Sequence, residues 1–137
     1  MGTSCLTIFN DSKHQEIAVL YTLYDGYMSG HGANLSRLMT GRKMVNGIGP
    51  SDSTLNSFNG PACLAAHIVS CLKKRIGDHY LFRAYKRNIL WEYIYIINVE
   101  LGKEAQITVF NCDNVFLYKG TATQMYSFCQ YLKGGGR

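Results

Sequence analysis

Short runs of β-branched and aromatic residues, separated by polar turns, recur along the chain and predict strands. Residues 6–10 and 17–23 are two such runs, and the polar residues 11–14 between them predict a hairpin at the start of the chain. Four more runs predict strands over residues 80–85, 90–99, 105–110 and 115–118. Because short turns join these four runs, we expect them to form an antiparallel meander.

Three other segments have the spacing or the end signals of helices. The first covers residues 33–38, and the last covers residues 121–132 with Thr121 or Thr123 as its N-cap. The segment 61–76 is the clearest, because a proline suits its first turn and a glycine follows its last. Its apolar residues occupy more than one face, which predicts packing against a sheet.

Residues 41–60 have no sustained period and are rich in Gly, Asn and Ser, with Pro50 among them. This composition predicts a long loop. A loop of that length in a compact domain tends to be functional or mobile. We therefore expect this segment to be a candidate for contact with a partner.

Together these elements predict one α+β domain over residues 1–133, followed by a flexible tail at 134–137. The sheet is expected to be antiparallel, with five to six strands from the N-terminal hairpin and a four-strand meander, and with three helices mainly on one face. In the run 90–99, large apolar residues occupy both odd and even positions, so both faces of the predicted strand are apolar. It is therefore a central strand covered on both faces, or one covered partly by a second subunit.

Glu92 is the most unusual charge in that run, because an inward carboxylate must be paired or protonated. On the neighbouring predicted strand and its turn, Arg83 and Arg87 are the expected partners. An unpaired Glu92 would instead mark a pocket.

The composition supports a folded chain from a reducing compartment. Of 137 residues, 47% are hydrophobic and only 17% are charged, so disorder is not expected. No run approaches the roughly 18 apolar residues of a membrane span, and the N-terminus lacks the features of a secretory signal. Five cysteines with no CxxC spacing favour reduced thiols over a disulfide framework or a zinc site.

The net charge of +5 favours an acidic partner if the cations gather on one face. The clusters are Lys73, Lys74 and Arg75, then Arg83, Lys86 and Arg87. One interpretation is a solvated helix end and hairpin loop, where cations also suit the C-terminal helix dipole. The other is binding of nucleic acid or phosphate.

The segment 24–32 concentrates glycines and polar aromatic residues, which indicates a shaped loop. The candidate binding residues are Tyr24, Asp25, Tyr27, Gly30, His31 and Gly32. They could form a small-molecule or nucleotide pocket, with backbone N–H groups holding an anion before the helix. The alternative, which we favour, is structural: Asp25 caps a turn, the glycines supply positive φ angles, and His31 bonds locally.

Cysteine chemistry offers two weaker hypotheses. Cys63 near a helix N-terminus and His79 at a later strand follow the order of papain-like and NlpC/P60-type peptidases, although the motifs of those families are absent. Cys63, His67 and Cys71 also share one helix face. We favour core packing for Cys63 and, for the three residues together, a helix face filled with small and intermediate side chains. We expect neither a metal site nor a cofactor.

The residues 19–32 have the form aliphatic-Tyr, any two, Tyr/Trp-Asp-Gly-Tyr, any two, Gly-His-Gly. This pattern resembles a signature of small uncharacterised proteins of large DNA viruses, Marseillevirus-like, and of bacteriophages. The segments around residues 46–47, 58–69 and 91–95 are similar to later segments of the proteins in that group, and Met28 stands where many members have proline. The resemblance implies a viral origin and no particular activity.

The sequence therefore favours a non-enzymatic viral accessory or virion protein. It is expected to act as a homodimer that binds a viral or host protein, in the host cytoplasm or nucleus and away from membranes. The first alternative is a nucleic-acid or nucleotide-binding protein that uses the basic residues and the Gly-rich loop. The second is a cysteine hydrolase built on Cys63 and His79.

Overall fold

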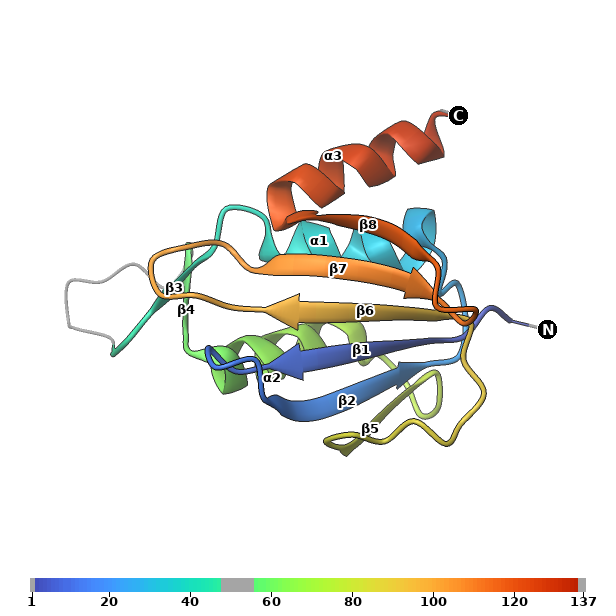
Figure 1. The fold of residues 1–137 in the computed structure, drawn as a ribbon, viewed down its shortest axis with the longest axis horizontal. Coiled ribbons are helices and arrows are strands. Elements are labelled where there is room, and N and C mark those ends of the chain that lie inside the picture. The colour runs from blue at the N-terminus through green and yellow to red at the C-terminus, as the bar shows by residue number, and fades with distance from the viewer. Residues whose placement is uncertain (1, 48–55, 136–137) are drawn as a thin grey trace.

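A six-stranded sheet with strand order β5-β2-β1-β6-β7-β8 organises the computed structural model, which describes residues 2–47 and 56–135 (Figure 1). The strands are β1 (Cys5–Asn10), β2 (Glu16–Thr22), β5 (His79–Arg83), β6 (Tyr93–Asn98), β7 (Gln106–Asn111) and β8 (Phe116–Thr121). All neighbouring pairs are antiparallel except β1 and β6, which are parallel. The predicted α+β class and the N-terminal hairpin are confirmed.

The predicted four-strand meander is wrong in one respect. Strand β5 pairs with β2 at one edge of the sheet, so only β6, β7 and β8 form a meander. The turn-like residues between β5 and β6 belong to a connection, residues 84–92, that crosses β2 and β1. Strands lie about 4.8 Å apart, so this crossing needs only about 15 Å, which an extended segment of that length spans.

The described residues also form three α-helices and one π-helical turn. The turn η1 (Met28–Gly32) runs directly into α1 (Ala33–Met39), and the other helices are α2 (Pro61–Leu72) and α3 (Ala122–Lys133). The larger buried cluster joins Leu35 of α1, Ile68 of α2 and Met125 of α3 to Tyr95 and Ile97 of β6. In Figure 1, α1 and α2 pass behind the sheet. None of the helices in the described ranges is both long and apolar enough to cross a membrane.

The opposite face of the sheet has a smaller buried cluster. Val19, Tyr21 and Ile94 belong to it, and Ile89 and Trp91 of the crossing segment pack against it. The carbonyl oxygen of Leu90 accepts hydrogen bonds from Ser4 Oγ at 3.0 Å and from the Tyr21 hydroxyl at 3.1 Å. The chain itself therefore contributes to both faces of β6, as expected for a central strand.

The segment expected to be a long loop contains two short strands. Strands β3 (Lys43–Val45) and β4 (Ser57–Asn59) pair in parallel, and residues 48–55 between them lie outside the described residues. Helix α2 ends at Leu72, four residues earlier than expected, because Lys73 is already extended. At the other end of the chain, residue 135 completes the turn after α3, and 136–137 of the expected tail lie outside the described residues.

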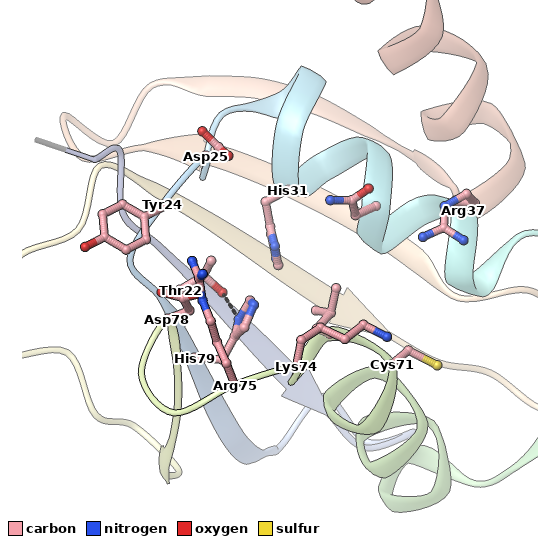
Figure 2. A pocket seen from close by; sticks show the side chains of 12 residues that line it. Thr22, Tyr24, Asp25, His31, Arg37, Cys71, Lys74, Arg75, Asp78 and His79 are labelled. Carbon is pink, nitrogen blue, oxygen red and sulfur yellow. Dashed lines mark hydrogen bonds and ion pairs between the residues drawn. The ribbon is translucent and has the colours of Figure 1, made fainter.

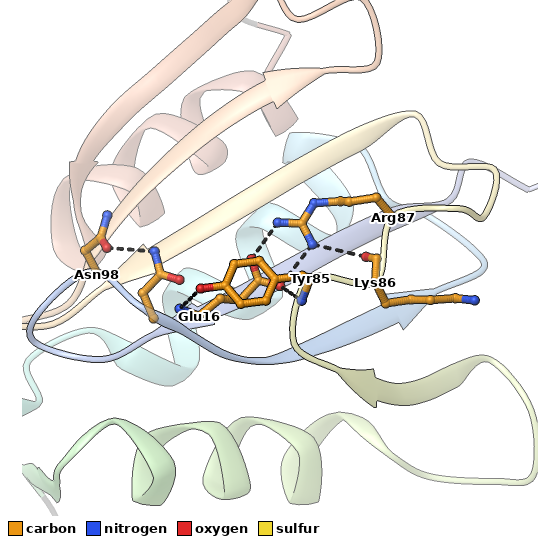
Figure 3. A network of polar contacts seen from close by, with 6 residues as sticks. Glu16, Tyr85, Lys86, Arg87 and Asn98 are labelled. Carbon is orange, nitrogen blue, oxygen red and sulfur yellow. Dashed lines mark hydrogen bonds and ion pairs between the residues drawn. The ribbon is translucent and has the colours of Figure 1, made fainter.

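The expected burial of Glu92 is wrong. It is exposed and precedes β6, so the alternation of a strand does not apply to it. Arg87 instead contacts Glu16, with Nη2 at 2.6 Å from Oε1, and the Glu16 side chain is only 5% exposed (Figure 3). The backbone N–H of Tyr85 also donates to Glu16, which therefore anchors the beginning of the crossing segment.

Candidate functional site

A polar cavity of about 670 Å³ lies where η1 and α1 face the C-terminal end of α2 and the start of β5 (Figure 2). We call it the polar cavity. One wall comes from residues 24–37, and the other comes from residues 71–79 together with Thr22 of β2. Two sequence segments that had separate interpretations, the Gly-rich loop and the first basic cluster, thus meet at one site.

The loop wall is shaped by close backbone contacts. Gly26 donates its N–H to the carbonyl of Thr3 at 2.8 Å, and a Cβ on Gly26 would lie 2.8 Å from both that oxygen and the Cβ of Cys5. Asp25 adopts a φ of 57°, and its carbonyl accepts the N–H of His31 at 2.7 Å. The role of this loop is structural, but not in the expected way: Asp25 has the positive φ, whereas Gly26, Gly30 and Gly32 do not. Gly26 is required by close contact instead, and the His31 side chain bonds to Thr7, 24 residues away, rather than locally.

His31 lies at the base of this wall and points into the cavity in Figure 2. Its Nε2 is 2.7 Å from Thr7 Oγ1, and its ring meets the Tyr95 ring edge-on at 5.1 Å between centroids. The Tyr95 hydroxyl in turn donates to the Gly26 carbonyl at 2.7 Å. Burial, and secondarily the neighbouring His79, lower the pKa of His31 to about 3, so the ring is neutral at physiological pH.

The opposite wall is more exposed and carries charge. Arg75 pairs with Asp78 at 2.5 Å, and His79 Nδ1 lies 3.0 Å from Thr22 Oγ1. Burial is the largest influence on the pKa of His79 and lowers it, with Asp78 opposing and Lys73 adding to the shift. Nε2 of His79 has no hydrogen-bond partner among the residues that the structure describes, so it is open to a ligand.

Two cations of the polar cavity are uncompensated. The side chains of Arg37 from α1 and Lys74 from the segment after α2 make no hydrogen bond or ion pair within the described part of the chain. Of the two carboxylates, Asp78 is paired with Arg75 and Asp25 accepts from the Tyr27 hydroxyl at 3.2 Å. The arrangement suits an anion that bridges both walls.

Several predicted binding residues lie elsewhere. Tyr24, Asp25 and His31 line the cavity, but Tyr27, Gly30 and Gly32 do not. Gly32 instead lies against Met125, Tyr95 and Cys129, which leave little room for a side chain.

The two basic clusters are separated. Lys74 and Arg75 line the cavity, whereas Lys73 donates to the carbonyls of Gly77 at 2.7 Å and His79 at 3.0 Å. The second cluster is not part of the cavity: Arg83 ends β5, Arg87 pairs with Glu16, and Lys86 lies over the Phe82 ring.

Arg37 lines the cavity although it was not among the predicted site residues. The sequence feature that could have identified it is the three-residue spacing of His31, Asn34 and Arg37, which places these residues on neighbouring turns of one helical face. Asn34 and Arg37 are exposed on that face although Leu35 between them is buried.

The structure does not bring Cys63 and His79 together. Cys63 is exposed in the first turn of α2, so the expected core packing of this residue is wrong. His79 follows the opposite end of that helix. At about 1.5 Å per residue, the helix alone separates Cys63 from Leu72 by about 14 Å. His67 lies 3.8 Å from the Cys71 sulfur, but no group of three metal-binding side chains occurs in the ranges that are described.

No family model matches the chain, and no curated protein or solved structure shows significant similarity to it. The class is therefore defined by the fold and the site alone. The chain is an α+β protein with a polar cavity, lined by cations, between two of its helices and the start of β5.

Proposed function

We propose that this is a non-enzymatic binding protein whose polar cavity takes a phosphate-bearing small molecule, a nucleotide being the best fit. The carrying observation is that Arg37 and Lys74 reach the cavity from opposite walls and are uncompensated. Guanidinium and ammonium groups are the usual protein donors to phosphate oxygens. Tyr24, which is 52% exposed beside the cavity, offers a ring on which a base could stack.

Binding without chemistry is supported by the state of the titratable groups. His31 is held neutral and hydrogen-bonded in the core, so it is a poor proton carrier at physiological pH. The separation of Cys63 and His79 favours binding over the hydrolase alternative.

The biological setting that we propose is that of a viral accessory or virion protein, acting as a homodimer in the host cytoplasm or nucleus. It rests on the resemblance of residues 19–32 to the viral signature. Exposed apolar side chains, Leu90 at 83% and Phe116 at 57%, offer surface that a second copy could cover. Native mass spectrometry tests the dimer, and a monomer at all concentrations would contradict it.

Calorimetric titration with inorganic triphosphate and with ATP tests the ligand. Lys74→Glu and Arg37→Glu should each weaken binding by about tenfold or more, because each replaces an attraction with a repulsion. The matched control is Lys119→Glu, the same charge change at an exposed position of β8 at the far edge of the sheet. Failure of the wild type to bind, or equal affinity in all three variants, would contradict the proposal.

The contribution of the base is tested separately. ATP should bind more tightly than triphosphate, and Tyr24→Ala should remove that difference while leaving the affinity for triphosphate unchanged. Equal effects of Tyr24→Ala on both ligands would argue against stacking.

A further inference from the structure

The outer edge of β5 has backbone groups without strand partners. The N–H of Leu23 donates to the carbonyl of Asp78 at 2.9 Å, which continues the antiparallel register of β2 and β5. Hydrogen-bonded pairs alternate along such a register. The N–H and C=O of Leu81 and the N–H of Arg83 therefore point away from the sheet.

An apolar groove of about 540 Å³ runs between this edge and helix α2. We call it the strand–helix groove. Its sides include Leu81 from β5, Ile17 from β2, and Ala65, Ala66 and Val69 from α2. Small residues on the helix leave the space open, and Leu81 remains 60% exposed although it is large and apolar.

The other face of the same edge is cationic. The rings of Tyr80 and Phe82 pack near Tyr21 of the second core, with centroids 6.4 Å away in both cases. The Lys73 ammonium lies 5.7 Å from the centroid of the Tyr80 ring, and the Lys86 ammonium lies 5.3 Å from that of Phe82. Two positive charges thus follow the edge on the face opposite the groove.

The nearby carboxylates do not neutralise this edge. Glu16 is paired with Arg87, and Asp78 is paired with Arg75. Arg83 at the end of β5 lies two residues from Leu81 and therefore on the groove face; it is exposed and makes no ion pair within the described residues. The face opposite the groove therefore has two ammonium groups: Lys73, which donates to the carbonyls of Gly77 and His79, and Lys86. Neither makes an ion pair with a carboxylate of the described residues.

We propose that the outer edge of β5 binds an extended acidic peptide of another protein as an added strand. The peptide backbone pairs with Leu81 and Arg83, and alternate aliphatic side chains enter the strand–helix groove. The intervening Asp or Glu side chains point to the other face, because successive side chains of a strand alternate, and they meet Lys73 and Lys86.

Charge complementarity selects this occupant over a second copy of the chain. Pairing two β5 edges about Leu81 would bring Lys73, Lys86 and Arg83 of both copies together, and like charges across a strand pair are destabilising. An acidic strand gains attraction at the same positions. This site lies outside the polar cavity, so it stands apart from the proposed phosphate site.

The probe is a short fluorescent peptide of alternating valine and glutamate, with a valine–lysine peptide of the same length as its control. Fluorescence anisotropy should show binding of the glutamate peptide and at least about tenfold weaker binding of the lysine peptide. Ala66→Glu, at an exposed α2 position beside the groove, should also weaken binding by about tenfold or more. Arg37→Glu, in the polar cavity, should leave the affinity within about twofold.

Hydrogen exchange measured by NMR identifies the mode of binding. The Leu81 and Arg83 amides should exchange quickly in the free protein and slowly with the glutamate peptide. The proposal is overturned if the peptide fails to bind, if Ala66→Glu binds it unchanged, or if it binds without protecting these amides. Protection that rises with protein concentration in the absence of peptide would identify a second copy as the occupant and overturn it as well.

Discussion

The two walls of the polar cavity are built in opposite ways. The loop wall is held by buried hydrogen bonds. Gly26 donates to the Thr3 carbonyl and accepts from the Tyr95 hydroxyl, and the His31 ring bonds to Thr7. The opposite wall carries Lys74 and Arg75, which are exposed and free of such packing. The Gly-rich signature, residues 19–32, thus belongs to the wall that shapes the cavity. The cations on which binding would depend, Arg37 and Lys74, lie outside this signature.

This contrast predicts that substitutions of the buried residues of the loop wall change stability, whereas substitutions of the exposed cations, Arg37 on that wall and Lys74 on the opposite one, change binding. The largest effect is expected for Gly26→Ala. The added Cβ would meet the Thr3 carbonyl and the Cys5 Cβ at 2.8 Å, and backbone must move to relieve it. We expect the free energy of unfolding in urea to fall by about 3 kcal/mol.

The matched control is Gly134→Ala after α3, where the nearest atom would be 3.5 Å from the new Cβ. It should change the free energy of unfolding by less than about 0.5 kcal/mol. Equal losses in the two variants would show that the loop wall is not held by close contact.

The neutral state of His31 predicts a pH dependence. Its pKa is about 3 in the folded protein and about 6.5 when unfolded, so between these values the unfolded chain binds a proton that the folded chain does not. The free energy of unfolding therefore falls as pH decreases, by about 2 kcal/mol from His31 between about pH 7 and pH 5.

Comparison with His31→Gln isolates this contribution, because the other histidines titrate in both proteins. Urea unfolding at the two pH values should show a loss that is smaller in the variant by about 2 kcal/mol. If the free energy of unfolding fell equally in both proteins, folding would not lower the pKa of His31, and His31 would be protonated in the folded protein at pH 5.

Tyr95→Phe should have a smaller effect. It removes the hydroxyl that donates to the Gly26 carbonyl but keeps the buried ring against His31. A buried carbonyl without its donor predicts a loss of about 1.5 kcal/mol in the free energy of unfolding. Tyr24→Phe, at a position 52% exposed beside the cavity, is the control and should be close to neutral.

The smallest effect on stability is expected in the charged wall. Arg75→Gln breaks an exposed ion pair with Asp78, and such pairs contribute little in water. The urea midpoint should not change measurably. A clear destabilisation would show that the two walls are less different than their packing indicates.

Local patterns predicted the elements better than their arrangement. The hairpin and the helix that begins at Pro61 follow from residues close in sequence. The crossing segment does not, because residues 86–88 are equally typical of a hairpin turn. Its path depends on contacts such as Glu16 with Arg87, 71 residues apart, which no local window contains.

The candidate site was predicted in two halves that the sequence could not join. The Gly-rich loop and Lys74 with Arg75 were each identified, but only the packing of α1 near α2 brings them to one cavity. Arg37 was missed because a lone arginine on a helix is most often a solvated residue. The prediction for Glu92 was wrong because the strand begins at Tyr93, three residues later than predicted and just after Glu92.

The most direct test of the proposed binding site is an NMR titration of the labelled protein with inorganic triphosphate. Binding in the polar cavity predicts saturable shifts of the amides around Arg37, Lys74, Arg75 and His79, with those around Arg83 and Lys86 unchanged. Shifts confined to the second basic cluster, or no shifts at all, would contradict the claim that the polar cavity is the binding site.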